Sequence, residues 1–586
     1  MVHPTLPRRG WLWGLIAGTA LLALACGPAA TPTPTPTNTP QPTATPTATP
    51  RPGETPTVAT PTPTATATPT PTPSGEQPKR GGIVRHRAQR DPSSFDPHTA
   101  TSSRDNITNA KLYSSLFINN SGSNFECNVC ESFDLEDGGA TWVFHLRRNV
   151  RFANDGKTLT SRDVKYSLDK IMGLVDGFIS PRSGWLKEYV DLTVGDGDGI
   201  EIVDDYTLKL HLVRPAPVLP KLLGTGFPGM LREGATREEL QTQPDGTGPW
   251  MVKEWQRGSI MKLEPNPYYF KEGRPYPDEW HMVFIRENRA ASSAFLTNRV
   301  DIKREDIPPD ELPIYERMAQ EGRIVHVEKP SGCRPQGVNF NVSAPPFDNL
   351  KLRQAVNLAL DRKAYIEAVH DGLASPALVF VLDSEFGRPA SEVWDKLPGW
   401  ASTPAAKAQE LEQARQLVAD AGYADGLDVT MVARSSGQYP QQAEFIAAEL
   451  RKININVTIK LMDSPELFPL VTALNYSIWP YWFCQTTLDP DEMWGSYFVT
   501  GGSRNWLGYS NPEVDELYIQ QSAELDPAKR TALNRQIEDI ILRDLPFAPT
   551  ADHNTFYDWY SYIKGWDDGH SFYTHESQDD AWIDRP

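Results

Sequence analysis

The stretch from residue 427 to residue 463, LDVTMVARSSGQYPQQAEFIAAELRKININVTIKLMD, decides the fold class. Its two ends, LDVTMVAR and NVTIKLMD, are short runs with the apolar pattern of strands. The segment QQAEFIAAELRKI between them has the length and composition of a helix. A strand, a helix and a second strand in this order predict a βαβ unit, and therefore a mixed α/β lobe with its own sheet.

Further helices are predicted on both sides of this unit. One is AAKAQELEQARQLVADAGY, which ends at Gly422, a residue suited to the conformation that follows a helix. Another is PFDNLKLRQAVNLAL, for which we expect Asp348 to be the cap. Two later helices open at Asn511-Pro512 and Asp526-Pro527, where a capping side chain precedes a proline at the first helical position.

The first half of the folded part contains more strand signals. The segment ATWVFHLRRNVRF alternates large apolar side chains with other residues, which predicts a strand with one buried face. A helix is expected after Thr160, with Asp163 placed to complete a capping box. A hairpin is predicted to turn at Asp204-Asp205, and a first strand runs from Gly82 to Arg87.

Charge and length limit the classes to which the protein can belong. The chain has 586 residues, with 57 Lys and Arg against 75 Asp and Glu, a formal net charge of −18. A nucleic-acid partner needs a basic surface, so the acidic balance argues against one. The length that follows the first eighty residues suggests two or three domains with sizeable cores.

The N-terminus has the features of an export signal. Arg8 and Arg9 precede an uncharged apolar run from Gly10 to Ala25, and small residues lead into Cys26. The run has the length of a secretory h-region and is short for a membrane span of about 20 residues. It resembles a bacterial lipoprotein signal, in which Cys26 would become the lipidated N-terminus. An uncleaved anchor helix is the alternative, and the arginine pair leaves both the Sec and the twin-arginine route open.

Residues 28–78 consist mainly of Thr, Pro and Ala. Such a composition has too few apolar side chains to offset the entropy of ordering the chain. Dense proline favours extended polyproline II, so fifty residues at roughly 3.1 Å each reach on the order of 150 Å. We therefore predict a tether, whose threonines also allow O-glycosylation.

Four segments in the folded part carry a family resemblance. They are, in order, CESFDLEDGGATWVFHLRRNVRFANDGKTLTSRDVKYSL, GTGPWMVKEWQRGSIMKLEPNPYYF, GVNFNVSAPPFDNLKLRQAVNLALDRKAYIEAV and WLGYSNPEVDELYIQQSAELDPAKRTALNRQIEDIILRDLPF. Together they resemble the peptide/nickel type (family 5) of extracytoplasmic solute-binding proteins that serve ABC importers. The resemblance implies a bilobal periplasmic-binding-protein-like fold, with two mixed-sheet lobes joined by a two-crossing hinge that closes on a ligand.

The resemblance also implies a division into domains. We expect a signal peptide at 1–25, the lipidated Cys and linker at 26–79, a large lobe at 80–335 and 550–586 with an inserted subdomain at about 115–245, and a small lobe at 336–549. The hinge crossings are expected near 334–341 and 548–558. The protein would be a monomer on the extracytoplasmic face of the membrane, held there by its lipid.

The segment IWPYWFCQTTLDPDEMW would carry the ligand chemistry. Peptide-binding members place an Asp, which captures the peptide ammonium, where this chain has Thr486. A neutral hydroxyl supplies no counter-charge in a closed cleft, so a free-amine peptide ligand is not favoured. Asp489 is a substitute for that role, and Arg434 at a strand end is a candidate for binding an anion. The remaining ligand candidates are Trp482, Phe483 and Trp494, which otherwise belong to the core, and Gln89 and Arg90 in the turn after the first strand.

Four cysteines follow Cys26. The resemblance implies a disulfide between Cys333 and Cys484, which would join the hinge strand to the ligand-bearing strand. Cys127 and Cys130 form a lone CxxC, and no nearby Cys or His completes a zinc site. A small structural bridge and two free thiols both remain open for this pair.

The motif inventory excludes common enzymes. The sequence contains no G-x-S-x-G, no H-E-x-x-H and no P-loop, so we expect neither catalysis nor a cofactor nor a metal. The function expected is a membrane-tethered receptor that delivers an extracellular solute, peptide-like or an oligosaccharide, to ABC permease subunits. A sensory receptor that presents its ligand to a signalling partner is the first alternative, and a secreted hydrolase is the second.

Overall fold

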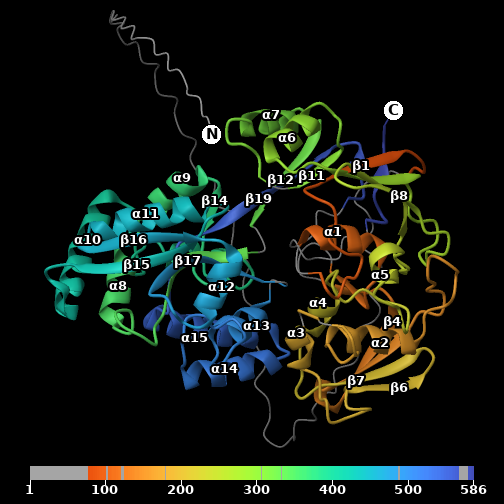
Figure 1. Cartoon of the computed structure of the whole chain (residues 1–586), viewed down its shortest axis with the longest axis horizontal. Coiled ribbons are helices and arrows are strands. Elements are labelled where there is room, and N and C mark those ends of the chain that lie inside the picture. Colours follow the sequence, from red (N-terminus) through yellow and green to blue (C-terminus); the bar gives the residue numbers. More distant parts are fainter. Residues whose placement is uncertain are drawn as a thin grey trace, which may run out of the picture. The chain divides into compact units, whose positions relative to one another are not determined.

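The βαβ unit predicted from residues 427–463 is present in the computed structural model. Strand β15 (Leu427–Arg434) runs parallel to β16 (Ile455–Met462), and helix α11 (Tyr439–Arg451) connects them. The helix packs on both strands (Figure 1) and buries Ile446 and Leu450 there. The α/β prediction is confirmed.

The structure describes residues 77–585, except 101–102, 120–124, 179, 182, 305, 331–332, 486, 488 and 567–577. The signal peptide, Cys26 and nearly all of the tether therefore lie outside the described residues, as does Thr486. Among the residues that are described, no helix is long and apolar enough to cross a membrane.

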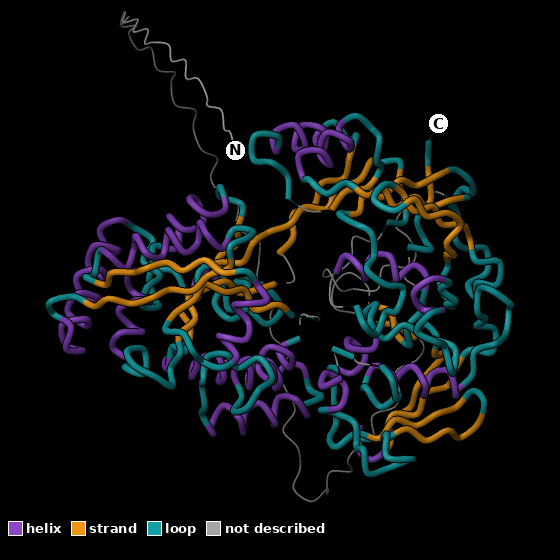
Figure 2. Tube along the Cα trace, in the orientation of Figure 1, coloured by secondary structure: helices purple, strands orange, loops and turns teal. Residues whose placement is uncertain are grey.

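The βαβ unit belongs to a five-stranded sheet, which forms the small lobe (Figure 2). The central strand β17 (Ile478–Cys484) pairs parallel with β15 and antiparallel with β13 (Cys333–Phe340). The order across the sheet is β16-β15-β17-β13-β18, and β18 spans Phe547–Pro549. The predicted ligand-bearing strand therefore lies at the middle of this sheet.

The large lobe is built on a mixed sheet in the order β12-β19-β11-β1-β10-β9-β8, with β14 pairing to β19 (Figure 1). Its first strand follows the prediction closely, since the strand expected at 82–87 is observed at 83–88. The strands are β1 (Ile83–Ala88), β8 (Trp250–Gln256), β9 (Ile260–Pro265), β10 (Glu279–Phe284), β11 (Ile302–Arg304), β12 (Ile324–Pro330), β14 (Ala374–Pro376) and β19 (Ala551–Tyr560).

The predicted inserted subdomain contains a separate antiparallel sheet, β4-β5-β7-β6. The helix expected after Thr160 is α2, and Asp163 completes its capping box by accepting from the Thr160 backbone N–H at 2.8 Å. The alternation predicted for β5 is incomplete, because Val143 is buried together with Trp142 and Phe144. The strands are β4 (Cys130–Glu136), β5 (Thr141–Leu146), β6 (Ile200–Asp204) and β7 (Thr207–His211). Two short ladders complete the described strands: β2 (Phe117–Asn119) with β3 (Phe125–Cys127), and β20 (Ile563–Lys564) with β21 (Trp582–Ile583).

Most helix starts follow the capping signals, with one correction. The helix α8 is capped by Asn349, which accepts from the Lys351 backbone N–H, and not by Asp348. Asn511 and Asp526 cap α14 and α15 as expected. The α-helices not yet bounded are α1 (Ser103–Leu112), α2 (Ser161–Ile171), α3 (Ser183–Lys187), α4 (Leu219–Leu223), α5 (Glu239–Thr242), α6 (Asn288–Leu296), α7 (Leu312–Gln320), α8 (Leu350–Ala359), α9 (Arg362–His370), α10 (Pro404–Val418), α12 (Ser464–Thr472), α13 (Pro490–Met493), α14 (Pro512–Ala523) and α15 (Pro527–Asp544).

Apart from β14, which pairs with the first residues of β19, the chain passes twice between the two large sheets. It leaves the large-lobe sheet after β12 and enters the small-lobe sheet at β13, and it returns between β18 and β19. These passages lie close to the hinge crossings expected from the sequence. The domain boundaries themselves stay a prediction.

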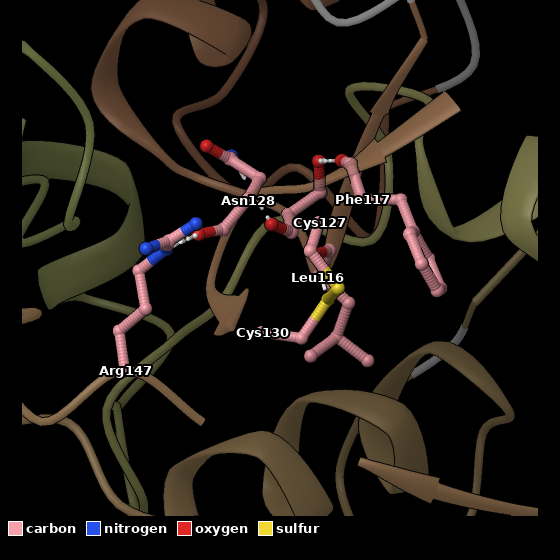
Figure 3. The surroundings of a disulfide bond; sticks show 7 residues. Leu116, Phe117, Cys127, Asn128, Cys130 and Arg147 are labelled. Carbon is pink, nitrogen blue, oxygen red and sulfur yellow. Dashed lines mark hydrogen bonds between the residues drawn. A yellow bond between two sulfur atoms is a disulfide. The ribbon is translucent and has the colours of Figure 1, made fainter. Parts of the chain in front are cut away.

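Cys127 and Cys130 form a disulfide (Figure 3). Cys130 is fully buried, and the Arg147 side chain donates to the carbonyl oxygen of Asn128 between the two cysteines at 2.8 Å. Of the two states that the sequence left open, the structure has the bridge. A disulfide fits a protein that matures in an oxidising compartment.

Replacing both cysteines of this bridge by alanine should lower the free energy of unfolding only modestly. The bridge closes a loop with a sequence separation of 3, for which chain entropy gives about 2 kcal/mol. Urea unfolding of the wild type with and without reductant, beside the double alanine variant, measures this effect. Alkylation of Cys127 and Cys130 in the unreduced protein, detected by mass mapping, would show that these thiols are free in solution.

Candidate functional site

A cavity of about 600 Å³ lies between the inserted subdomain and the small lobe. A volume of this size is typical of small-molecule sites. The subdomain contributes Glu188 and Tyr189 to its lining, and the small lobe contributes Glu492, Arg504 and Trp506. Both acidic and basic groups therefore face a space that two parts of the chain enclose.

Asp489, predicted as a substitute for the ammonium-binding carboxylate, is committed to partners within the protein. It is fully buried, and Arg530 pairs with both of its oxygens. Lys221 donates to the same carboxylate at 3.1 Å. Burial acts to raise the pKa of Asp489, but the charges of Arg530 and Lys221 outweigh it and hold that pKa below its usual range. The carboxylate thus remains ionised and carries structural ion pairs.

Phe483 and Trp494 are core residues in the structure. Both are buried in the apolar cluster of the small lobe. Trp494 donates from Nε1 to Asn534 Oδ1 at 2.6 Å, and its ring meets Phe380 edge-on. Strand alternation explains the position of Phe483, because side chains at 481 and 483 point to the same face of β17.

Trp482 and Arg434 are brought together around Tyr439. The indole of Trp482 stacks on the Tyr439 ring with centroids 5.1 Å apart, and the Arg434 guanidinium lies 5.2 Å from the same ring centroid. Arg434 Nε and Trp482 Nε1 are both buried and lack a hydrogen-bond partner among the described residues. Buried donors normally have a hydrogen-bond partner, and a ligand that carries acceptor atoms would supply one to each of these two donors.

A second arginine, Arg504, lies at the cavity, whereas Arg434, Tyr439 and Trp482 are not part of its lining. Arg504 lines the cavity and donates to the carbonyl oxygen of Cys484 at 3.1 Å and to Tyr497 Oη at 3.0 Å. Burial raises the pKa of the Tyr481 hydroxyl, and both Arg504 and Arg434 act against that rise. Both guanidinium groups therefore act electrostatically on the same hydroxyl.

Gln89 and Arg90 follow β1 in the large lobe, and neither belongs to the described lining of the cavity. Arg90 is exposed, with Nη2 3.8 Å from Asp105 on α1. The structure thus places Arg90 beside a carboxylate of the large lobe, and a role of this pair in ligand binding stays a prediction.

Cys333 and Cys484 lie directly opposite each other in the antiparallel register of β13 and β17. Opposed residues in such a pair have Cβ atoms about 4.5–5.5 Å apart, close to disulfide geometry. The Cys333 side chain lies outside the described part of the structure, so the bridge stays a prediction.

Tyr189, Glu188 and Arg504 were missed by the sequence analysis. The first two lie in the turn just after α3, where the sequence has no unusual pattern. Arg504 follows the glycines of VTGGSR, a loop signal close to the ligand-bearing strand that could have drawn attention to it. These residues come together because segments that are distant in the sequence pack against each other in the fold.

Three comparisons with known proteins bear on this geometry. The model of bacterial extracellular solute-binding proteins, family 5 Middle, matches residues 124–505. The glutathione-binding protein GsiB of Salmonella choleraesuis (strain SC-B67) is 24% identical over 477 residues, which cover 78% of this chain and 86% of that protein.

Two solved structures share the fold. DppA from Helicobacter pylori, in complex with the peptide STSA, superimposes with a TM-score of 0.69 at 21% identity and covers 86% of this chain and 99% of its own. HbpA2 from Haemophilus parasuis gives a TM-score of 0.71 at 19% identity and covers 86% and 100%. The bilobal fold is thereby confirmed, and the family match spans more than half of the chain. The chain belongs to the family 5 bacterial extracellular solute-binding proteins.

Proposed function

We propose that this protein is a membrane-tethered receptor that binds a small extracellular solute between its lobes and delivers it to an ABC importer. The observation that carries the proposal is the pair of unsatisfied buried donors, Arg434 Nε and Trp482 Nε1, beside Tyr439. Closure of two lobes on a ligand buries it, and only the closed form would be accepted by the permease. Family membership supports this function over catalysis or sensing.

The solute class follows from the groups available. Arg434 suits a carboxylate, which a guanidinium binds through two parallel hydrogen bonds. Trp482, which is only partly buried between the rings of Tyr439 and His553, is an apolar contact that suits an apolar group or a sugar ring. The names of the relatives point to glutathione and peptides as ligands. We infer a peptide-like solute anchored through its carboxylate, with an oligosaccharide as the second class.

The anchor and the bridge complete the proposal. Cys26 would carry two acyl chains, which give stable attachment where one chain is marginal. The Thr/Pro segment would hold the lobes away from the bilayer, on the extracytoplasmic face, where the protein would act as a monomer. The bridge between Cys333 and Cys484 would hold β13 and β17 together where the chain enters the small lobe, a proposal supported by their register.

A thermal-shift screen tests the function and ranks the solutes. The panel contains free-amine tripeptides, their N-acetyl derivatives, glutathione and oligosaccharides. Because Thr486 offers no counter-charge, N-acetyl tripeptides should stabilise the protein at least as well as free-amine ones. If free-amine tripeptides alone raise the melting temperature, the inference from Thr486 is wrong. If no member of the panel does, the proposed solute classes are wrong.

Replacing Arg434 by Met should weaken binding of an N-acetyl tripeptide roughly 10- to 100-fold, because a charge-assisted hydrogen bond is lost. Arg451→Met, at the exposed last turn of α11, is the matched control and should bind like the wild type. Isothermal titration measures both affinities. Equal affinity in the Arg434→Met variant would place the carboxylate elsewhere.

A further inference from the structure

Two polar contacts connect the inserted subdomain to one short segment of the small lobe beside the cavity. The hydroxyl of Tyr189, just after α3, donates to Asp491 in α13. The ammonium of Lys221 in α4 lies 3.1 Å from Asp489, the N-cap of α13. Both carboxylates are almost fully buried, so each contact is made away from water. Electrostatic contacts in such a setting are stronger than on the surface.

A second pair of contacts flanks the first. Tyr518 in α14 donates to Glu188. The Arg214 guanidinium lies 5.3 Å from the Tyr189 ring and 5.9 Å from the Tyr518 ring. Its Nε is 3.4 Å from Ser522 Oγ, also in α14. Segments of the subdomain that are distant in sequence thus meet α13 and α14 together.

The carboxylates of the small lobe also have partners that do not depend on the subdomain. Asp489 is paired with Arg530, and Asp491 accepts from Gln521 Nε2 at 2.6 Å. If the inserted subdomain moves away from the small lobe, Arg530 and Gln521 still contact the two carboxylates, because all four residues belong to the small lobe. Of the bonds that the two carboxylates accept, those from Tyr189 and Lys221 are lost, so these bonds stabilise the closed arrangement and not the small lobe itself.

We propose that Tyr189 and Lys221 form a latch that holds the inserted subdomain against α13 and so keeps the cavity closed. The inference rests on the proposed lobe closure and adds that the subdomain, not the hinge alone, determines it. Both residues are positioning residues. Asp489 and Asp491 are their acceptors, which explains why Asp489 is occupied by protein partners.

The latch should respond to pH through Asp491. Burial, together with the charge of Asp489, raises the pKa of Asp491 to about 6. In an open form the carboxyl regains water and its pKa falls towards the ordinary value of about 4. The closed form then binds more protons between these values, so closure strengthens as the pH falls, by about tenfold from pH 7.5 to pH 5. The titratable and charged groups around Asp491 are Asp489, Glu492, Glu188, Tyr189, Arg214, Lys221, Tyr518 and Arg530.

Hydrogen–deuterium exchange of the full-length protein without ligand tests the latch. The readout is the protection of peptides that cover 183–190 and 490–498, corrected for intrinsic exchange at pH 5 and pH 7.5. Tyr189→Phe should reduce protection roughly tenfold in both segments, because one charge-assisted bond across the contact is lost. Tyr206→Phe, in the same subdomain with its ring on Arg148, should change neither.

The Asp491→Asn variant tests the pH dependence of protection, which a purely structural role of Asp491 would not produce. Its amide oxygen still accepts from Tyr189 but cannot titrate, so protection of both segments should be the same at the two pH values, whereas the wild type gains about tenfold at pH 5. The latch is wrong if Tyr189→Phe affects only its own segment, or if the wild type shows no gain at low pH. If no solute of the thermal-shift screen stabilises the protein, the proposed solute classes are wrong and this result still stands.

Discussion

Arg530→Met should lower the free energy of unfolding by about 3–5 kcal/mol, because it leaves the buried Asp489 carboxylate without its principal partner. Arg530 pairs with both oxygens of Asp489, and the Asp489 side chain is inaccessible to solvent. Lys221 remains, but a single ammonium reaches only one of the two oxygens. Urea unfolding at pH 7 measures the loss.

The matched control is Arg543→Met on the same helix, because the Arg543 side chain is 59% exposed and pairs with Asp544. An exposed pair contributes at most about 1 kcal/mol, so this variant should unfold close to the wild type. A loss for Arg530→Met no larger than the control would show that the buried pair adds no net stability.

The stability of Arg530→Met should depend on pH in a defined direction. The native pKa of Asp489 lies below its usual value, so its pairing stabilises the wild type above about pH 4 and less as the pH falls further. In Arg530→Met the carboxyl protonates more easily. The difference in the free energy of unfolding between the wild type and Arg530→Met should therefore be largest at pH 7 and become smaller towards pH 4.

Trp494→Ala should cost about 3–5 kcal/mol of stability, the range for removing a large aromatic side chain from a core. The indole is fully buried, meets Phe380 and Phe498, and donates to Asn534. Trp494→Phe keeps most of the ring packing and loses the hydrogen bond, so its loss should be clearly smaller. Chemical unfolding of the two variants gives the comparison.

Trp494 also separates the core interpretation from the ligand interpretation. The affinity of the folded Trp494→Phe variant for an N-acetyl tripeptide should equal that of the wild type, whereas Trp482→Ala should weaken it by removing the stacked face beside Tyr439. A weaker affinity in Trp494→Phe, with stability unchanged, would return this residue to the ligand site.

Local patterns predicted the elements well. The βαβ unit at 427–463, the capping box of Thr160 with Asp163, and the caps at Asn511 and Asp526 all lie where the sequence placed them. Each depends on interactions within a few residues, which a pattern records directly. The difference between Asp348 and Asn349 at α8 is one residue, within the usual uncertainty of helix ends.

The ligand site could be predicted only in part. Arg434 and Trp482, named separately as ligand candidates, lie in one cluster around Tyr439, and their binding role stays a prediction, whereas Phe483 and Trp494 are buried in the core. Composition cannot separate these cases, because an aromatic residue suits both environments. The contact of Lys221 with Asp489 joins residues 268 positions apart, and no local signal reports such a pair.

The most direct test of solute binding is native mass spectrometry of the full-length protein after incubation with N-acetyl tripeptides, beside Arg434→Met. We expect one bound tripeptide per wild-type chain and little or none on the variant. The proposed binding is contradicted if the wild type shows only its own mass, or if both proteins bind the tripeptide equally.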